Sequence, residues 1–348
     1  MKKIAFTGGG SAGHVVPNIA LIDDLKKYGD FEVCYFGSNG MEKELICARG
    51  IPYFQTDCPK LIRSKSFSAF KKNLQIPFRL HRAIAKTKQA LKKEKPDLVF
   101  SKGGFVALPV VLAARKLKIP CFTHESDYSA GLANRLIAKK CNAVFTSFPE
   151  TAKSFKNGVF TGAPMRKELF EKDKIAAKIC FGLPISKPTI LIVGGGQGSE
   201  ILNNGIRNAL SQLQDFSVLH LCGKGNIVKS ARENYRQFEY LENIGDAYAA
   251  ADIILSRAGA GAIFEILALK KPALFIPLEN ASRGDQLENA SYFEKKGLCA
   301  VLRESEIQKL PNALRETYSN ATLKRNLKNC DLTCGNDRIL TELKAFLQ

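Results

Sequence analysis

The chain contains the same opening twice: an apolar run, a cluster of glycines and then a stretch with helical periodicity. The first copy spans residues 3–27 with glycines at 8–10, and the second spans residues 187–210 with glycines at 194–196. Each copy begins a series of alternating strand-like and helix-like segments, which predicts βαβ units and a parallel sheet. The repeat therefore predicts an α/β fold with two Rossmann-like halves and a cleft between them.

The first glycine cluster has the spacing of a dinucleotide-binding loop, because Gly8, Gly10 and Gly13 satisfy G-x-G-x-x-G. That fingerprint also requires an acidic residue at the end of the second strand, where it would bind a ribose. The second predicted strand, residues 32–36, is instead followed by glycine and serine. We therefore interpret the loop as an approach for a phosphate or a sugar, and an NAD-dependent oxidoreductase is disfavoured.

His14 directly follows this loop, at the predicted start of the first helix. The positive end of a helix dipole disfavours a charged imidazole, so His14 is expected to be neutral and able to act as a general base. The alternative is that His14 packs against the loop and has only a structural role.

Residues 251–290 form the most informative stretch, which reads as strand, glycine turn, helix and strand. Residues 252–256 are a short apolar run that leads into Arg257, and residues 258–261 supply small side chains where the helix is expected to begin. Such a turn lets a phosphate or ribose approach the free N–H groups at the helix end. Glu265, on the same helix, could accept hydrogen bonds from both hydroxyls of a ribose. The alternative is that Glu265 is an ordinary first-turn partner of the helix dipole.

Three further strands are predicted in the first half, at residues 98–101, 121–123 and 143–146. Glycine or polar residues follow each strand, as is typical of the ligand-binding edge of a parallel α/β sheet. Glu125 and Asp127 form a close acidic pair at this edge. For either residue, a helix-capping or supporting role is as reasonable as catalysis.

The formal net charge of +19 indicates an anionic partner, and many of the basic residues lie in one segment. Residues 60–95 contain twelve Lys or Arg residues against one acidic residue, Glu94, with apolar side chains interleaved. Such a segment is typical of a surface that lies on an anionic membrane. The alternative is a solvated basic helix that packs by its apolar face. Nucleic acid is disfavoured, because no RNA- or DNA-binding motif accompanies the charge.

The ten cysteines are scattered, and the four histidines show no metal-ligand spacing. This pattern predicts neither a disulfide framework nor a zinc site, and it favours free thiols in a reducing compartment. No apolar run approaches the roughly 20 residues of a membrane span, and no signal-peptide pattern is present, so a cytoplasmic location is expected.

Seven segments resemble, in order and spacing, the motifs of one enzyme family. They read GGGSAGHVVPNIAL, SKGGFVALPVVLAA, HESDYSAGLANRLIA, TGAPMRKELF, ILIVGGGQGSEILN, SRAGAGAIFEILALKKPALFIPL and SRGDQLENA. They are similar to those of the MurG family, glycosyltransferases of peptidoglycan synthesis that move N-acetylglucosamine from UDP-N-acetylglucosamine to lipid I. The resemblance covers nearly the whole chain. It implies the GT-B glycosyltransferase architecture, with two Rossmann-like parallel-sheet domains facing across a cleft.

The resemblance also implies that the two domains bind different substrates. Residues 1–163 would bind the lipid I acceptor and associate with the membrane, and a C-terminal helix at residues 335–348 would pack back on them. Residues 164–334 would bind the UDP-N-acetylglucosamine donor. The implied enzyme uses no cofactor and no metal, and it is a peripheral protein at the cytoplasmic face of the cell membrane. Cell-wall or division-complex proteins are the protein partners that the resemblance suggests.

Carried over residue by residue, the resemblance assigns donor contacts to individual positions. Glu265 would hold the ribose, Arg166 would contact the diphosphate, and Gln286 would face the sugar hydroxyls. The uracil would lie against Leu241 and hydrogen-bond to its backbone. The remaining donor contacts would come from two glycine-rich turns: Gly196, Gln197, Ala260, Gly261 and Ala262.

On the acceptor side, the resemblance assigns the pyrophosphate loop to three residues: Ser11, Ala12 and Gly13. His14 would be the general base, Glu125 is the second candidate for a catalytic role, and Asp127 would reach the donor sugar.

Three positions depart from the usual family pattern. Ala12 stands where many members carry glycine, and its methyl group is tolerated only if the backbone keeps a negative φ. Gly196 replaces a serine, so that donor contact must come from backbone N–H groups or Gln197. Asp127 replaces an asparagine, and an ionised carboxylate can only accept hydrogen bonds.

The implied reaction is an inverting transfer, in which the muramyl 4-hydroxyl attacks the anomeric carbon opposite UDP through an oxocarbenium-like transition state. Helix N-termini after Gly198 and Gly261, together with Arg166, would stabilise the departing diphosphate. Two rivals remain: a UDP-sugar transferase or hydrolase that uses a soluble acceptor or water, and a nucleotide-sugar binding protein without turnover. The acceptor-side motifs weigh against the first rival, and His14 weighs against the second.

Overall fold

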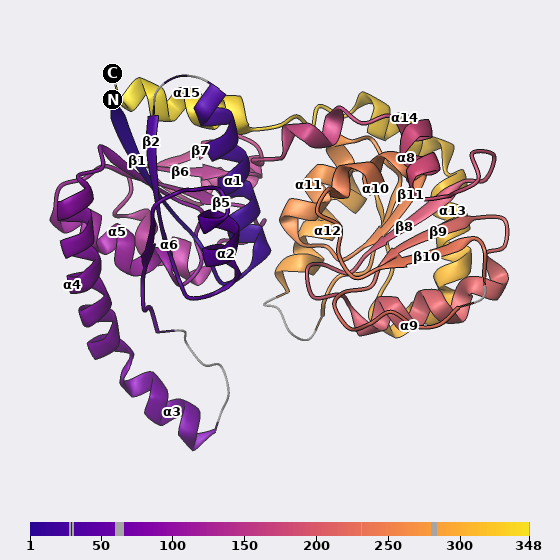
Figure 1. The fold of residues 1–348 in the computed structure, drawn as a ribbon, viewed down its shortest axis with the longest axis horizontal. Coiled ribbons are helices and arrows are strands. Elements are labelled where there is room, and N and C mark those ends of the chain that lie inside the picture. The colour runs from indigo at the N-terminus through magenta and orange to yellow at the C-terminus, as the bar shows by residue number, and fades with distance from the viewer. Residues whose placement is uncertain (28, 30, 60–65, 231, 280–283, 348) are drawn as a thin grey trace. The chain divides into compact units, whose positions relative to one another are not determined.

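The computed structural model describes residues 1–347 except 28, 30, 60–65, 231 and 280–283. The chain forms two compact units: unit 1 comprises Met1–Met165 and Cys334–Gln348, and unit 2 comprises Arg166–Thr333 (Figure 1). Each unit is built around a parallel sheet of its own.

The sheet of unit 1 has seven parallel strands in the order β3-β2-β1-β4-β5-β6-β7. These strands are β1 (Lys2–Thr7), β2 (Phe31–Gly37), β3 (Tyr53–Gln55), β4 (Leu98–Ser101), β5 (Cys121–Glu125), β6 (Ala143–Thr146) and β7 (Gly158–Phe160). The strand order reverses between β1 and β4. The loops that follow these two strands therefore border the position where open α/β sheets bind ligands.

Helices cover both faces of this sheet. Alternate residues of β1 point to opposite sides, and the apolar side chains on each side are buried against helices. Ile4 and Phe6 join a core that also contains side chains of α1 (Ala12–Lys27) and α15 (Asn336–Leu347). Ala5 joins a second core with α4 (Ile76–Glu94) and α5 (Ala107–Lys116). The other described helices of unit 1 are α2 (Met41–Cys47), α3 (Phe67–Leu74), α6 (Leu132–Ala138) and α7 (Pro149–Lys153).

The helix α15 returns to unit 1 after the whole of unit 2. Three of its aliphatic side chains are buried in the core with β1 and α1: Ile339, Leu340 and Leu343. The amide of Asn336, the first residue of α15, donates to the carboxylate of Asp24 on α1 at 2.7 Å and to the carbonyl of Met165 at 2.9 Å. The backbone N–H of Gly335 donates to the carbonyl of Ala163 at 2.8 Å. Within unit 1, residues 335–336 are thus hydrogen-bonded to residues 163–165.

The sheet of unit 2 has six parallel strands in the order β10-β9-β8-β11-β12-β13. These are β8 (Thr189–Val193), β9 (Ser217–Leu221), β10 (Tyr235–Phe238), β11 (Ile253–Ser256), β12 (Ala273–Phe275) and β13 (Ala300–Val301). Its helices are α8 (Lys174–Cys180), α9 (Glu200–Ala209), α10 (Ile244–Ala250), α11 (Ala260–Ala268), α12 (Asp285–Lys295), α13 (Leu310–Ser319) and α14 (Ala321–Asn329), with short 3-10 helices at Lys167–Phe170, Leu210–Gln212 and Glu304–Lys309. The order reverses between β8 and β11, which places the glycine turns after these strands at the second switch point.

The predicted α/β fold with two Rossmann-like parallel-sheet halves is confirmed. The strands predicted at residues 98–101 and 143–146 match β4 and β6 residue for residue, while the strand predicted at 121–123 continues to Glu125. In the described part of the chain, no helix is both long and apolar enough to cross a membrane.

Candidate functional site

In unit 1, the loop after β1 is shaped by glycines that have no room for a side chain. Gly10 has a φ of 83°, and a Cβ there would lie 2.6 Å from the ring of Phe105. A Cβ on Gly8 would lie 2.8 Å from the carbonyl oxygen of His14. Beyond these glycines, Ser11 and Gly13 are exposed, and Ala12 begins α1 with a helical backbone. The loop therefore presents accessible backbone next to the N-terminus of α1, where anions bind favourably.

His14 lies in the first turn of α1, with Nδ1 2.9 Å from the hydroxyl oxygen of Ser11. Its ring lies over Gly104, where a Cβ would be 3.3 Å from Nδ1. Burial and the nearby charge of Lys102 lower the pKa of His14 to about 4. The imidazole is therefore neutral at pH 7 and can accept a proton, and His14 as a whole residue is partly exposed.

Lys102 is a buried charge directly after β4, with only 2% of its surface exposed. Its ammonium group is 2.9 Å from Nδ1 of His124 and also donates to the hydroxyl of Ser126. His124 Nε2 is 3.0 Å from the carbonyl oxygen of Gly162. Because that oxygen can only accept, Nε2 carries the proton and Nδ1 accepts from Lys102. Burial lowers the pKa of Lys102 to about 8, against the opposing effects of Glu125 and Asp127.

The carboxylate of Glu125 is occupied by the loop that follows β5. It accepts hydrogen bonds from the backbone of Asp127 at 3.0 Å, from the backbone of Gly131 at 2.8 Å and from the side chain of Asn134 at 2.9 Å. Glu125 is only 4% exposed. This arrangement favours a supporting role, in which Glu125 fixes the loop that carries Asp127.

In unit 2, Arg166 and Glu265 form a two-point ion pair. Arg166 Nε donates to Glu265 Oε1 at 3.0 Å, and Nη2 donates to Oε2 at 2.8 Å. Glu265 is the sixth residue of α11, which begins at Ala260 and has no acidic residue in its first turn. The alternative that Glu265 is a first-turn dipole partner is wrong, because Glu265 lies beyond the first turn. Its charge is instead paired with Arg166. A carboxylate has about four acceptor sites, so it can still receive hydroxyl groups.

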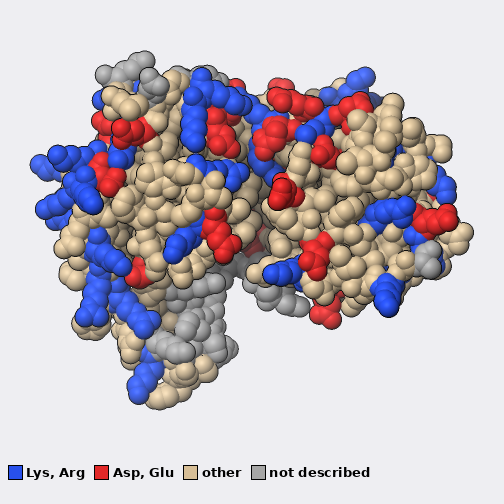
Figure 2. All heavy atoms as spheres, in the orientation of Figure 1, with Lys and Arg blue, Asp and Glu red and all other residues tan. Residues whose placement is uncertain are grey.

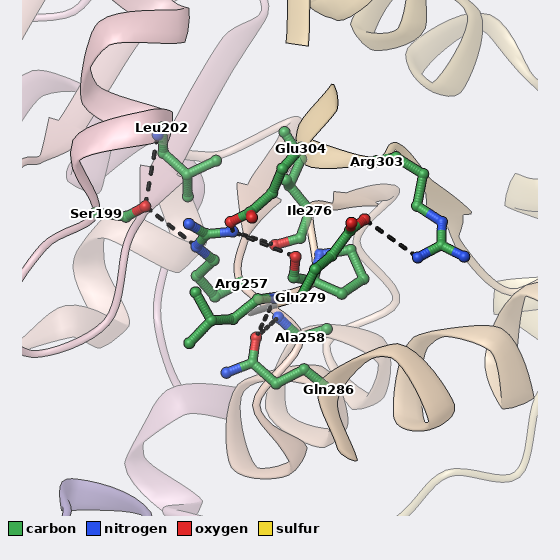
Figure 3. A network of polar contacts seen from close by, with 11 residues as sticks. Ser199, Leu202, Arg257, Ala258, Ile276, Glu279, Gln286, Arg303 and Glu304 are labelled. Carbon is green, nitrogen blue, oxygen red and sulfur yellow. Dashed lines mark hydrogen bonds and ion pairs between the residues drawn. The ribbon is translucent and has the colours of Figure 1, made fainter. Parts of the chain in front are cut away.

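A pocket of about 570 Å³ lies at the switch point of the unit 2 sheet. Its walls come from the turn after β8, the turn after β11 and α12, and they include Gly195, Ser199, Gly259, Ala262 and Gln286. The side-chain oxygen of Gln286 accepts from the backbone of Ala258 at 3.2 Å and of Leu278 at 3.0 Å (Figure 3). Among the described residues its amide nitrogen has no partner, so it remains available as a donor.

Arg257 connects the two turns of this pocket. Its Nε donates to Ser199 Oγ at 3.1 Å, and its Nη1 donates to Glu304 at 2.6 Å and to the carbonyl of Ile276 at 3.1 Å (Figure 3). Ser199 caps α9 by accepting from the backbone of Leu202. The guanidinium group therefore fixes the start of α9 relative to β11.

Three other predicted donor residues, Gly196, Gln197 and Gly261, are accessible backbone outside the pocket wall, and Ala260 is buried. Gly196 and Gln197 are exposed in the turn after β8, and no described atom would lie within 4 Å of a Cβ at Gly196. Gly261, between Ala260 and Ala262, is equally open among the described residues. Leu241 lies half-buried between β10 and α10, outside the lining of the pocket. The pocket wall thus includes both Ala262 and Gln286 and does not include Leu241. In the part of the chain that is described, no cluster of His, Cys, Asp or Glu is arranged to hold a metal ion.

Two family models match the chain: the glycosyltransferase family 28 N-terminal domain at residues 4–146 and the glycosyltransferase family 28 C-terminal domain at residues 189–333. A Clostridium tetani protein named "UDP-N-acetylglucosamine--N-acetylmuramyl-(pentapeptide) pyrophosphoryl-undecaprenol N-acetylglucosamine transferase" is 46% identical, and the alignment covers 99% of this chain and 98% of the relative. A Clostridium botulinum protein of the same name is also 46% identical, over 99% of each chain. This chain belongs to the MurG family.

One solved structure agrees with this assignment of the chain to the MurG family, and a second supports the fold. The crystal structure of Acinetobacter baumannii MurG is 25% identical, with a TM-score of 0.73 over 99% of this chain and 100% of that one. The calicheamicin glycosyltransferase CalG4 is 15% identical, with a TM-score of 0.72 over 100% of this chain and 98% of that one, and supports the fold alone. Two parallel-sheet α/β units with these neighbours confirm the predicted GT-B fold class.

Four polar residues of this MurG-family chain were not predicted as site residues: Lys102, His124, Arg257 and Glu304. For Lys102, the available signal was a lysine immediately after a predicted buried strand. For Arg257, it was an arginine at the start of a glycine turn. Glu304 has no local signal, because its partner Arg257 is 47 residues away in the chain.

Proposed function

We propose that this protein transfers N-acetylglucosamine from UDP-N-acetylglucosamine to the 4-hydroxyl of the N-acetylmuramyl group of lipid I, which forms lipid II for peptidoglycan synthesis. The observation that carries the proposal is the 46% identity, over 99% of the chain, to relatives named as this transferase. The site geometry supports it, because each unit has an accessible glycine turn at the switch point of its sheet.

Unit 2 is the proposed donor-binding unit. The carboxylate of Glu265 would accept the ribose hydroxyls, and the backbone of Leu241 would bind the uracil. The amide of Gln286 would bind the sugar hydroxyls, with a nitrogen that is free among the described residues. Backbone N–H groups would bind the diphosphate at two turns: Gly196, Gln197, Ala260, Gly261 and Ala262. Arg166 would add a charge, since Nη1 makes none of its hydrogen bonds to Glu265.

Unit 1 is the proposed acceptor-binding unit. The diphosphate of the acceptor would bind at residues 11–13, where the N-terminus of α1 and exposed backbone favour an anion. His14, neutral at pH 7, would take the proton of the attacking hydroxyl. Asp127 would contact the donor sugar from a loop that Glu125 holds in place. Inversion at the anomeric carbon follows from attack opposite the leaving UDP.

The expected result of a direct test is UDP release that depends on the acceptor. Purified protein is incubated with UDP-N-acetylglucosamine, with and without a short-chain lipid I analogue, in the presence of EDTA. UDP should appear only with the acceptor. EDTA should not reduce the rate, because Arg166 and backbone N–H groups, and no metal ion, are proposed to stabilise the leaving UDP. UDP release without acceptor would identify a hydrolase instead, and no release at all would favour a binding protein.

The proposed membrane surface of unit 1 consists of α3 and α4. Four large apolar side chains on these helices are exposed by 58–80%: Phe67, Phe70, Leu74 and Phe78. Exposed basic side chains accompany them on α4, and Figure 2 shows Lys and Arg gathered on this side of unit 1. Figure 1 shows α3 beyond the end of α4, away from the sheet. The first part of the predicted membrane segment, residues 60–65, lies outside the described residues.

Apolar side chains flanked by basic ones suit an anionic bilayer, and they support a peripheral location at the cytoplasmic face of the cell membrane. Removing four positive charges from α4 should weaken binding to anionic vesicles by about 1 kcal/mol per charge, or roughly 10³-fold in total. The substitutions are Arg79→Gln, Arg82→Gln, Lys92→Gln and Lys93→Gln. Co-sedimentation with vesicles containing phosphatidylglycerol measures the effect.

A matched control removes the same number of charges from exposed positions of unit 2. Its substitutions are Lys224→Gln, Lys229→Gln, Lys295→Gln and Lys328→Gln. This control should bind the vesicles like the unaltered protein. Equal losses in both variants would mean that net charge alone directs binding, and no loss in the α4 variant would rule out this surface.

A further inference from the structure

Lys102 is the most deeply buried cation near the proposed acceptor loop, and the proposed mechanism does not use it. Its side chain is 2% exposed, and its ammonium group is bound by His124 and Ser126 on the neighbouring strand end. Burying an ammonium group is costly unless the group is well hydrogen-bonded. The packing of the sheet alone does not explain why an ammonium group is buried at position 102.

The segment that contains Lys102 touches both the loop and His14. A Cβ on Gly8 would lie 2.8 Å from the carbonyl oxygen of His14 and 3.3 Å from Cβ of Lys102. A Cβ on Gly104 would lie 2.7 Å from the carbonyl oxygen of Gly9 and 3.3 Å from Nδ1 of His14. The loop after β1 and the residues after β4 are therefore in direct contact, with the imidazole resting on them.

The charged groups that act on His14 come from two elements. Lys102, after β4, lowers the pKa of His14, and Glu42, on α2, raises it. Glu42 is fully buried, and its carboxylate accepts from the backbone of Ser38 at 2.9 Å. Glu125, the last residue of β5, and Asp127, just after it, act on Lys102 and help to keep it protonated.

The substrate adds a further charge at this place. The proposed function puts the acceptor diphosphate at residues 11–13, directly beside His14. A nearby anion stabilises an imidazolium and so raises the pKa of the histidine. Without a compensating cation, acceptor binding would itself favour protonation of the base that must then receive the hydroxyl proton.

We propose that Lys102 is a positioning residue whose buried ammonium group, fixed by His124 and Ser126, offsets the acceptor diphosphate and extends to lower pH the range in which His14 stays neutral when the acceptor binds. This inference rests on the proposed function, because it takes His14 as the base and the diphosphate as its neighbour. In this proposal Lys102 affects the protonation of His14 and does not contact the reacting atoms.

The test is a pH titration of the His14 ring by NMR in full-length protein labelled at histidine, with a His14→Gln spectrum for assignment. In Lys102→Met, the pKa of His14 should rise by about 1, and it should rise further with inorganic pyrophosphate as the anion probe. Lys102→Arg keeps the charge and should restore the original value. The acid limb of kcat/KM should move to higher pH in Lys102→Met by the same amount.

Lys102→Gln serves if the methionine variant does not fold, since an amide can still hydrogen-bond His124 and Ser126. Because Lys102 and His14 both lie in unit 1, thermal unfolding of the full-length protein, followed by circular dichroism, reports folding in each variant. An unchanged pKa of His14 in a folded, uncharged variant would overturn the inference. The assignment of His14 as the general base is tested separately, because full activity in a His14 variant would reject it. The titration would still measure whether Lys102 acts on His14.

Discussion

Replacement of His14 with alanine should lower kcat by roughly 10²–10⁴-fold, the range typical of a lost general base. The imidazole is neutral at pH 7 because its pKa is lowered to about 4, and His14 as a whole residue is partly exposed beside the loop proposed to bind the acceptor. The donor should still bind, since no residue of unit 2 is altered. Steady-state rates of UDP release with the lipid I analogue measure the first effect, and calorimetry with UDP measures the second.

A second histidine provides the control for this substitution. His81 is exposed on α4, in the surface proposed to bind the membrane, so His81→Ala should leave the rate with the short-chain analogue in solution, without vesicles, unchanged. The pH dependence gives an independent check with a defined sign. Only neutral His14 can accept a proton, so a lowered pKa preserves activity at acidic pH, and kcat/KM should not fall between pH 7 and 6. Near-normal turnover in His14→Ala would mean that another group removes the proton.

Replacement of Glu265 with alanine should weaken UDP binding by at least about 100-fold. Two hydrogen bonds from ribose hydroxyls to a carboxylate would be lost, at about 1.5–3 kcal/mol for each. The variant should also be less stable, because Arg166 is left without its partner in a site where its side chain is 23% exposed. Removing one member of a fully buried pair costs about 3–5 kcal/mol, and the partial exposure reduces this to about 2.

The double variant Glu265→Ala with Arg166→Ala separates these two effects. It removes the unpaired charge, so part of the lost stability should return in thermal unfolding. UDP affinity should stay low, because the ribose acceptor is still missing and the proposed diphosphate contact of Arg166 is lost as well. If the double variant regains both stability and UDP affinity, Glu265 acts only as the partner of Arg166 and does not bind the ribose.

Local sequence signals were sufficient for several strands, such as β4 and β6, and for the glycine turns, but the short edge strands β3 and β13 were not predicted. Strands of a parallel sheet are buried on both faces and appear as continuous apolar runs, which is why β4 and β6 could be placed without error. Glycines mark turns with positive φ or no space for a side chain, as at Gly10 and Gly198. These signals lie within a few residues of the structure they predict.

The pairing of charges could not be predicted in the same way. Arg166 and Glu265 were placed separately on the donor diphosphate and the ribose, yet they bind each other across 99 residues of chain. The burial of Lys102 depends on two neighbouring strand ends coming together. Such contacts are properties of the packed sheet, and no spacing along the chain encodes them.

The return of α15 affects how the protein is made. Unit 1 is translated first, but Ile339, Leu340 and Leu343 reach its core only after the ribosome has synthesised all of unit 2. At about 5–20 residues per second, that delay is roughly 10–30 s. During this interval the side of the sheet and of α1 that α15 will cover remains apolar and open to chaperones or to other nascent chains. The part of the protein that begins folding first is therefore the last to be completed.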